Sequence, residues 1–335
     1  MIRKTLLALC VALTCLAGGS GCGVLRGDDP AARAAREPAA ASSSKAPADE
    51  LPYDVTPLLH PDKKYFGVAV DGAPSSMKPV DTFARTVGKK PNLVGSYSSW
   101  GDGFNAKGAE NVFHDGGLMY VSWEPFKPGL DKIADGSQDT YIKKYAKSVR
   151  ETNVPVAISF GHEMNGHWYP WGTKDTTAAT FVKAWRHIHD VFQDVGATNV
   201  VWAWSPNVIN PVPSVKLKPY WPGDAYVDWV GIVGYWTMTG AHTFETLYGP
   251  TRRQIAKFTD KPVLISETSA EPGERRRADV RALLGGVEQD DGVLGFLWFN
   301  IPKRADWRIQ SSPLALAEFK RLIADDAFGF EVPRS

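Results

Sequence analysis

The stretch that decides the fold covers residues 176–204, TTAATFVKAWRHIHDVFQDVGATNVVWAW. Large apolar side chains recur in it at helical spacing: Phe181, Trp185, Ile188, Phe192 and Val195. Gly196 follows as a C-terminal stop, and the largely apolar run 199–204 then predicts a strand buried on both faces. A helix joined directly to such a strand is the repeating unit of a parallel α/β sheet.

The same alternation of strand and helix extends along the chain. A second helix is predicted over 137–153, SQDTYIKKYAKSVRETN. Including 199–204, eight strands are predicted, at residues 65–70, 92–97, 117–123, 154–160, 199–204, 227–235, 261–267 and 292–299. Eight units fit a closed (β/α)8 TIM barrel better than an open sheet, so we predict a single barrel domain over 56–335. The Pro-rich segment 207–226 is predicted to be a long loop that contributes to a binding site.

The N-terminus predicts export. Residues 1–22 begin with basic Arg3 and Lys4, continue with an apolar run and end in small residues and Cys22. The apolar run is shorter than the ~20 residues that span a bilayer, which disfavours a permanent transmembrane helix. The end of this segment is similar to a bacterial lipoprotein signal in which Cys22 is lipidated, although Gly19 stands where Leu is usual. The alternative is a secreted protein without a lipid.

Composition limits the remaining possibilities. Residues 23–55 are rich in Ala, Pro and Ser and are predicted to be a linker. All three cysteines lie in the first 22 residues, so no disulfide or thiol ligand is expected in the domain. Lys plus Arg (38) nearly balance Asp plus Glu (37), which argues against a nucleic-acid partner. We expect a monomer at the cell surface or secreted, with the membrane contacted only through the lipid.

Two carboxylates follow predicted strands at the barrel end where active sites lie. Glu163 lies in SFGHEMNGHWYPWG (159–172), and Glu267 lies in VLISETSA (263–270). Glycoside cleavage needs a proton donor and an ionised carboxylate whose pKa values differ. His162 and nearby indoles could keep Glu163 protonated, and Tyr235 could keep Glu267 ionised.

Aromatic residues at strand ends suggest a sugar-binding cleft, because pyranose rings stack on indole faces. The candidates at or just after strand ends are Trp100, Trp123, Trp168, Trp171, Trp204, Trp236 and Trp298. Packing within the barrel is the alternative for about half of these indoles. Asn165 is a further candidate for substrate binding.

Other chemistries fit the sequence poorly. His162, Glu163 and His167 lack the His-Glu-x-x-His spacing of a zinc site, because Gly166 occupies the second histidine position. The chain has neither a Gly-x-Ser-x-Gly elbow nor a P-loop. We therefore expect neither a metal nor a cofactor.

Three segments carry a family resemblance. GHEMNGHWYPWG (161–172), VLISETSA (263–270) and GFLWFNIPKRADWRI (295–309) resemble glycoside hydrolase family 26, a group of retaining β-glycanases built on a (β/α)8 barrel. The likeness extends in weaker form from about Tyr65 to Leu322.

The resemblance implies a role for each matching residue. It implies that Glu163 is the general acid/base and Glu267 the nucleophile. It further implies that His162 positions the acid/base, that Tyr235 hydrogen-bonds the nucleophile, that Trp298 forms the floor under the cleaved sugar, and that Trp168 packs on a neighbouring sugar.

The sequence also departs from the family pattern. Ser159 stands where an Arg is usual, four residues before the acid/base, and VSWEP (121–125) and WYPWG (168–172) differ from typical mannanases, which tend to have a His in the former. We expect a retaining endo-β-glycanase that acts on a plant-type β-linked polysaccharide, with β-1,4-mannan first, mixed-linkage β-1,3-1,4-glucan second and β-1,3-xylan third. The alternative is a glycan-binding lipoprotein whose catalysis is weakened at Ser159.

Overall fold

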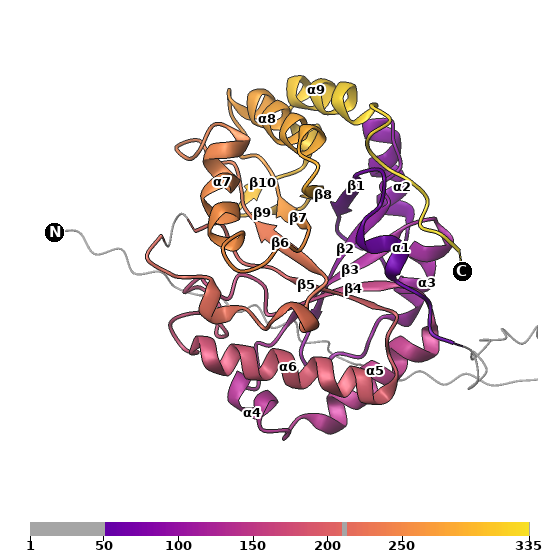
Figure 1. The fold of residues 1–335 in the computed structure, drawn as a ribbon. Helices are drawn as coiled ribbons and strands as arrows, with labels where there is room; N and C mark the ends of the chain where they lie inside the picture. Colours follow the sequence, from indigo (N-terminus) through magenta and orange to yellow (C-terminus); the bar gives the residue numbers. More distant parts are fainter. Residues whose placement is uncertain (1–50, 210–212, 335) are drawn as a thin grey trace, which may run out of the picture. The chain divides into compact units, whose positions relative to one another are not determined.

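The fold is a closed eight-stranded parallel barrel, seen in a computed structural model that describes residues 51–209 and 213–334. The strands pair in chain order from β1 to β8, and β8 pairs with β1 to close the barrel (Figure 1). Their bounds are β1 (Tyr65–Ala69), β2 (Leu93–Ser99), β3 (Leu118–Glu124), β4 (Val156–Phe160), β5 (Val200–Trp204), β6 (Trp229–Val233), β7 (Val263–Thr268) and β8 (Val293–Phe299). Every predicted strand is confirmed to within two residues at each end.

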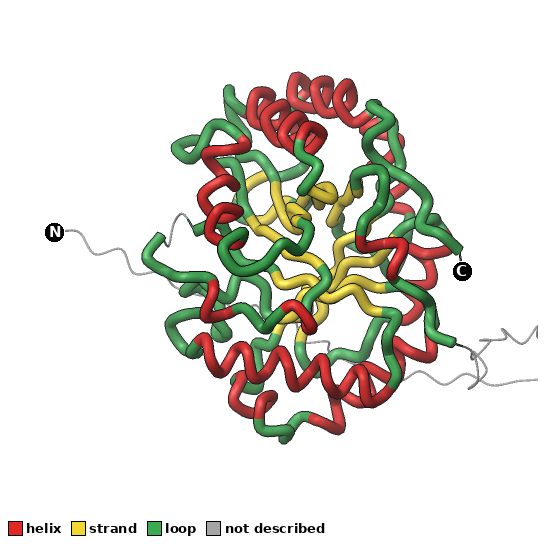
Figure 2. Tube along the Cα trace, in the orientation of Figure 1, coloured by secondary structure: helices red, strands yellow, loops and turns green. Residues whose placement is uncertain are grey.

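Helices surround the barrel, as Figure 2 shows with helices in red around yellow strands. They are α1 (Thr56–Leu59), α2 (Lys78–Val87), α3 (Ala106–His114), α4 (Leu130–Ala134), α5 (Asp139–Thr152), α6 (Ala178–Val195), α7 (Phe244–Ile255), α8 (Arg276–Gln289) and α9 (Pro313–Ile323). The predicted helices at 137–153 and 176–196 are α5 and α6. Helix α6 begins where the Thr177 side chain accepts a hydrogen bond from the Thr180 amide, and it ends at Gly196 in the left-handed conformation.

Alternate residues of each strand point to opposite faces of the sheet. In β5, Val201 and Ala203 face the barrel interior, whereas Trp202 and Trp204 pack in the layer between strands and helices. The interior is filled by Tyr65, Leu93, Leu118, Tyr120, Ala157, Trp229, Leu264, Leu294 and Leu297. The barrel interior is therefore a packed core and not a pore.

The predicted start of the domain at residue 56 is too late. Tyr53 is 4% exposed, its amide donates to the side chain of Asn153, and its hydroxyl donates to the carbonyl of Pro333. The barrel therefore includes at least residues 53–55, which the sequence assigned to the linker. The predicted signal segment, Cys22 and residues 23–50 lie outside the described residues.

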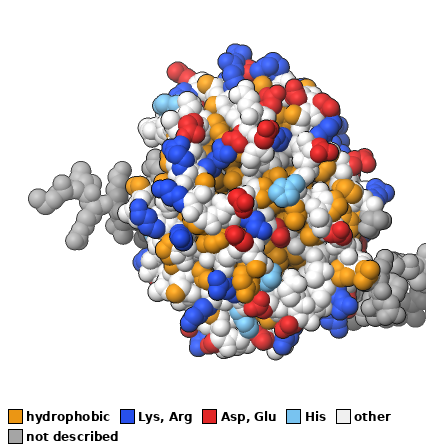
Figure 3. Space-filling view, viewed as in Figure 1, with side chains coloured by type: hydrophobic (Ala, Val, Ile, Leu, Met, Phe, Trp, Pro, Cys, Tyr) orange, Lys and Arg blue, Asp and Glu red, His pale blue; other side chains and the backbone are white. Residues whose placement is uncertain are grey.

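The loop after β5 contains two short 3-10 helices, η1 (Lys218–Tyr220) and η2 (Asp224–Tyr226). Two further short strands, β9 (Pro302–Lys303) and β10 (Ala305–Asp306), form a hairpin after β8. Lys and Arg side chains are interspersed with Asp and Glu over the face drawn in Figure 3. Within residues 51–209 and 213–334, no helix is long and apolar enough to cross a membrane.

Candidate active site

Glu163 lies just beyond β4 in a strained backbone conformation. Its φ is 56°, in the left-handed region that non-glycine residues seldom adopt. The Glu163 amide donates to the carbonyl of Ser205 at 2.7 Å, and its carbonyl accepts from the Gly166 amide at 2.9 Å. Strain of this kind persists where the surroundings fix it, and it occurs often at functional sites.

The carboxyl group of Glu163 is buried and has two donors. Trp168 Nε1 donates to Oε2 at 2.7 Å, and the Asn207 side-chain amide donates to Oε1. Burial raises the pKa of Glu163 to about 7, and the charge of Glu267 adds to the increase, against the opposing effect of these two hydrogen bonds. Glu163 can therefore hold a proton at neutral pH, which a general acid requires.

Glu267, in β7, has different surroundings. Both of its carboxylate oxygens accept phenolic hydrogen bonds, from Tyr97 at 2.5 Å and from Tyr235 at 2.6 Å. The enclosed positions of the two hydroxyls, and then the charge of Glu267, raise the pKa of both tyrosines well above 10, so they remain donors. The two carboxyl groups thus lie in one site with contrasting partners.

Comparisons with known proteins point to one family. A sequence model described as Glycosyl hydrolase family 26 matches residues 129–262. Endoglucanase H of Acetivibrio thermocellus is 30% identical over 266 residues, which cover 75% of this chain and 29% of that protein. The chain belongs to glycosyl hydrolase family 26.

One further sequence relative and one solved structure show how far the similarity extends. Mannan endo-1,4-beta-mannosidase A and B of Caldalkalibacillus mannanilyticus is 30% identical over 149 residues, covering 42% of this chain and 25% of that protein. The catalytic domain of the Bacillus sp. JAMB-750 GH26 endo-beta-1,4-mannanase superposes with a TM-score of 0.63 at 20% identity, covering 80% of this chain and 87% of that one, and shares the fold. The chain spans less than a third of the length of each of the two sequence relatives.

The structure overturns five of the seven tryptophan candidates, among them Trp171, which is 1% exposed and donates from Nε1 to the carbonyl of His162. The buried side chains of Trp123, Trp204, Trp236 and Trp298 are at most 1% exposed and lie in the layer between strands and helices. Trp298 packs on Phe319 of α9, with ring centroids 5.4 Å apart, so it cannot form the floor under a sugar. Trp168 is different: it is 37% exposed and bonded to Glu163.

Strand alternation separates the residues that reach the site from those that do not. Counting in twos from interior residues of each strand leads to Tyr97 after Leu93, to Glu124 after Leu118, and to Asn207 after Val201. Trp123, Trp204 and Trp236 fall on the opposite parity, whereas the count fails in β8, where the interior residues Leu294 and Leu297 are three positions apart. Position at a strand end, without this count, did not identify Tyr97, Glu124 and Asn207 as site residues.

Glu267 does not follow this count. The register between β7 and β8 shifts between Ile265 and Thr268, so the alternation breaks beside the nucleophile candidate. Trp307, in the loop after β8, was also missed; its ring centroid lies 5.0 Å from that of Tyr235. No strand count could place Trp307, because the β9–β10 hairpin lies between it and β8.

His162 and Asn165 take different positions from those expected. Burial lowers the pKa of His162, and its ring packs against Tyr169 at 5.1 Å. The carboxyl of Glu163 takes its hydrogen bonds from Trp168 and Asn207 and not from His162. Asn165 is fully buried, and its side-chain amide bonds both the amide and the carbonyl of Asn207, so it positions Asn207 and cannot contact substrate directly.

Ser159 occupies the position where the family usually has Arg. It is fully buried, and its hydroxyl donates to Ser205 Oγ at 2.7 Å, which also bonds Tyr120 Oη at 2.8 Å. A neutral hydroxyl network therefore replaces a cation beneath the site. The carbonyl of Ser205 accepts a hydrogen bond from the amide of Glu163. The hydroxyl network is therefore connected to the loop that contains the acid/base candidate.

Among the described residues, no group of three or more His, Cys, Asp and Glu side chains could hold a metal ion.

Proposed function

We propose that this family 26 chain is a retaining endo-β-glycanase. A carboxylate oxygen of Glu267 attacks the anomeric carbon while Glu163 gives its proton to the departing glycosidic oxygen, which breaks the glycosidic bond. Glu163, now ionised, then removes a proton from water. The resulting attack on the glycosyl ester releases Glu267 and returns the original anomeric configuration.

One observation carries this proposal: the two carboxyl groups have opposite environments. Glu163 is buried and has a raised pKa of about 7, whereas Glu267 accepts two phenolic hydrogen bonds, which stabilise a charged oxygen. Two acids held in different protonation states satisfy the requirement for separate proton donor and nucleophile. Trp168, which is partly exposed and adjacent to Glu163, would pack against a sugar of the leaving group.

The proposed substrate is a plant-type β-linked polysaccharide, with β-1,4-mannan first. The mannosidase name of one relative and the mannanase name of the structural neighbour support this choice. β-Glucan is the second candidate, because the longer sequence match is to an endoglucanase and the segment VSWEP (121–125) lacks the His expected in mannanases.

Reducing-sugar release by the purified protein tests the proposal. The substrates are galactomannan, glucomannan, mixed-linkage glucan and β-1,3-xylan, each measured with wild type, Glu163→Ala and Glu267→Ala. Turnover of one polymer that disappears in both variants supports the hydrolase. Binding without turnover, unchanged in Glu163→Ala, would instead support a glycan-binding protein.

We also propose that residues 1–22 direct export and that Cys22 carries a lipid. The basic start, apolar run and terminal Cys22 support this localisation. Mass spectrometry of the mature N-terminus tests it: a diacylglyceryl group on Cys22 that is absent from Cys22→Ala supports lipidation, and an unmodified N-terminus beyond Cys22 supports simple secretion.

A further inference from the structure

Two cavities adjoin at the carboxyl ends of β1, β2 and β8. The first, of about 230 Å³, lies between the ends of these three strands. The second, of about 190 Å³, lies between β2, β3 and the loop that leads from β2 to α3. Three residues line both cavities, namely Ser96, Tyr97 and Asn105. The two cavities therefore share one wall, which is formed by β2 and the N-cap of α3.

The first cavity lies beside the nucleophile candidate. Tyr97, which lines it, donates the 2.5 Å hydrogen bond to Glu267. Glu163 follows β4, whereas most of the cavity lining belongs to β1 and the loop after it, three strands away around the barrel. Because the leaving sugar departs beside Glu163, this cavity lies on the side of the glycone, the part of the substrate that becomes attached to Glu267.

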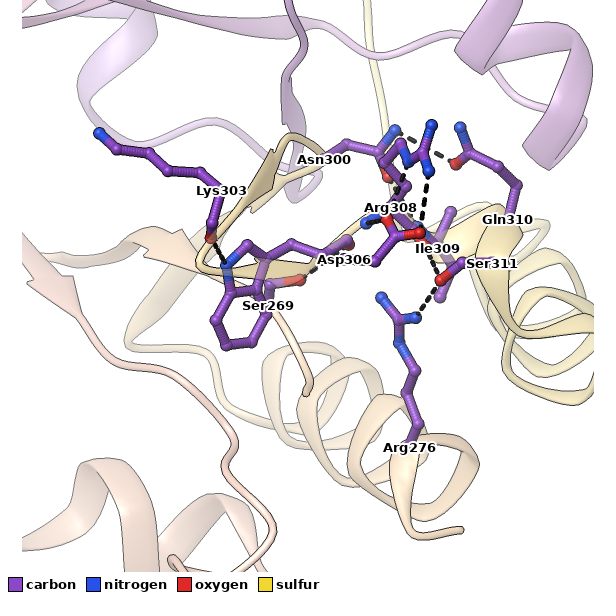
Figure 4. A network of polar contacts seen from close by, with 10 residues as sticks. Ser269, Arg276, Asn300, Lys303, Asp306, Arg308, Ile309, Gln310 and Ser311 are labelled. Atoms are coloured by element: carbon purple, nitrogen blue, oxygen red, sulfur yellow. Dashed lines mark hydrogen bonds and ion pairs between the residues drawn. The ribbon is translucent and has the colours of Figure 1, made fainter. Parts of the chain in front are cut away.

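The wall of the first cavity next to β8 is held in place. It is formed by Ile301, which directly follows Asn300. The Asn300 side chain accepts a hydrogen bond from the Ile309 amide at 2.8 Å and donates one to Gln310 at 3.2 Å (Figure 4). These bonds fix the backbone on this side of the cavity.

The second cavity is closed at its inner end. On β2, Ser98 has the opposite parity to Tyr97 and therefore faces the helices. Met119 and Val121 of β3 and Tyr145 of α5 complete this end, and each of the three is at most 2% exposed. A polysaccharide chain cannot run through a cavity with a buried end. Only a terminal sugar unit can enter it.

Two hydroxyl groups in the second cavity have no partner. Tyr145 Oη and Ser98 Oγ are both buried, and neither makes a hydrogen bond of normal geometry to any residue that the structure describes. A hydroxyl buried in this way destabilises a protein, because folding removes water that no other donor or acceptor replaces. A ligand with hydroxyls of its own would supply the missing hydrogen bonds.

The lining indicates a neutral ligand. Asp71 lines the first cavity and Asp102 the second, and no described residue that lines either cavity is Lys, Arg or His. An anion would therefore be repelled without a compensating positive charge.

The second cavity also combines polar and apolar surface. Phe104 and Met119 lie beside its hydroxyls. A pyranose matches this combination, because its C–H faces are apolar and its hydroxyls both donate and accept hydrogen bonds. The volume of about 190 Å³ is several times that of one water molecule, so there is room for a ring.

We propose that the second cavity binds a single neutral sugar attached as a branch to the glycone, while the main chain occupies the first cavity. The proposal rests on the proposed hydrolase function. Two observations carry it: the second cavity adjoins the first at Tyr97, and its closed end admits only a terminal unit. The substrate class is a β-glycan with single-sugar branches. Asp102 would exclude branches that carry a carboxylate.

Paired oligosaccharides test the proposal. One is a linear oligosaccharide of the polymer that the wild type cleaves, and the other is the same chain with one neutral sugar branch; for β-mannan the branch is a galactosyl group. The wild type should cleave the branched form with a kcat/KM at least equal to that for the linear form. In isotopically labelled water the label enters the new reducing end of the glycone product, and mass spectrometry should find the branch on this labelled product.

Two substitutions isolate the second cavity. Tyr145→Phe removes one hydroxyl and should lower kcat/KM for the branched form by about 2- to 12-fold, the range of one neutral hydrogen bond, with no change for the linear form. Ser98→Leu extends an apolar side chain into the cavity and should lower kcat/KM for the branched form further. Tyr226→Phe is the matched control, because η2 lies just before the amino end of β6, and it should leave both substrates unaffected.

Thermal unfolding separates ligand binding from a structural role. Because the Tyr145 hydroxyl has no partner in the described part of the protein, Tyr145→Phe should not lower the Tm. A lower Tm together with equal losses on the linear and branched forms would show that this hydroxyl supports the fold, and it would overturn the inference.

Three other results would also overturn the inference. They are full kcat/KM of both variants on the branched form, a branch found on the unlabelled product, and a wild type that cleaves the linear form but not the branched one. If the wild type cleaves neither oligosaccharide and no polymer, the proposed function itself is wrong, and the inference with it.

Discussion

Trp168 Nε1 donates a 2.7 Å hydrogen bond to Oε2 of Glu163, five residues earlier in the chain. The bond favours the ionised carboxyl and therefore lowers the pKa of Glu163, against the larger increase caused by burial. The local sequence that places an acid in a buried position thus also supplies the group that moderates its proton affinity.

The first prediction concerns pH. Glu163 must be protonated to act as the acid, so kcat/KM should fall as pH rises through about 7. Trp168→Phe removes the N–H donor and keeps an aromatic ring. The pKa of Glu163 should then rise, and the alkaline limb should move to higher pH. A limb that moves to lower pH would contradict this assignment.

The fall in activity caused by removing the acid should depend on the leaving group of the substrate. Glu163→Gln should lower kcat/KM by about 10²- to 10⁴-fold on oligosaccharides, the range of general acid catalysis. The loss should be much smaller with an activated aryl leaving group, which needs no proton in the first step. Glu274→Gln, at an exposed position, is the control and should behave as wild type. Equal losses on both substrates would argue against the acid role.

The nucleophile can be identified covalently. A 2-deoxy-2-fluoro glycoside with a good leaving group should inactivate the wild type and form an ester that is hydrolysed slowly, because the fluorine destabilises the positively charged transition state. Peptide mass spectrometry should find the added sugar on the peptide containing Glu267. A label on Glu124 or Glu163 instead would require a different mechanism.

Both tyrosines that donate hydrogen bonds to Glu267 should contribute to kcat/KM. Tyr97→Phe and Tyr235→Phe each remove one hydrogen bond to a carboxylate, a change worth about 1.5–3 kcal/mol. We therefore expect kcat/KM to fall by about 10- to 150-fold in each variant, with the Tm close to that of wild type. Full activity of Tyr97→Phe would show that its short bond to Glu267 has no part in turnover.

Substitution of Trp298 should affect mainly stability, whereas substitution of Trp307 should affect mainly substrate binding. Trp298 is fully buried, so Trp298→Ala should lower the free energy of unfolding by about 3–5 kcal/mol. Trp307 is partly exposed and lies against Tyr235, so Trp307→Ala should raise KM with a smaller loss of stability. Denaturant unfolding and steady-state kinetics on both variants distinguish the two effects. A raised KM for Trp298→Ala at full stability would reinstate the sequence assignment.

The amino-acid sequence by itself determined the barrel, its eight strands and the two candidate carboxylates. Strand and helix periodicities are local, and Glu163 and Glu267 follow strand ends that a barrel brings to one face. The substitution at Ser159 was equally visible in the sequence.

Only the tertiary structure decided which side chains enter the cleft. Side-chain direction depends on strand parity, and the irregular register near Glu267 and the hairpin before Trp307 interrupt the count. The contacts of Glu163 with Asn207, and of Glu267 with Tyr97, join residues 44 and 170 positions apart. The first pair lies at the ends of the neighbouring strands β4 and β5, whereas the second depends on barrel closure, because the pairing of β8 with β1 brings β7 near β2.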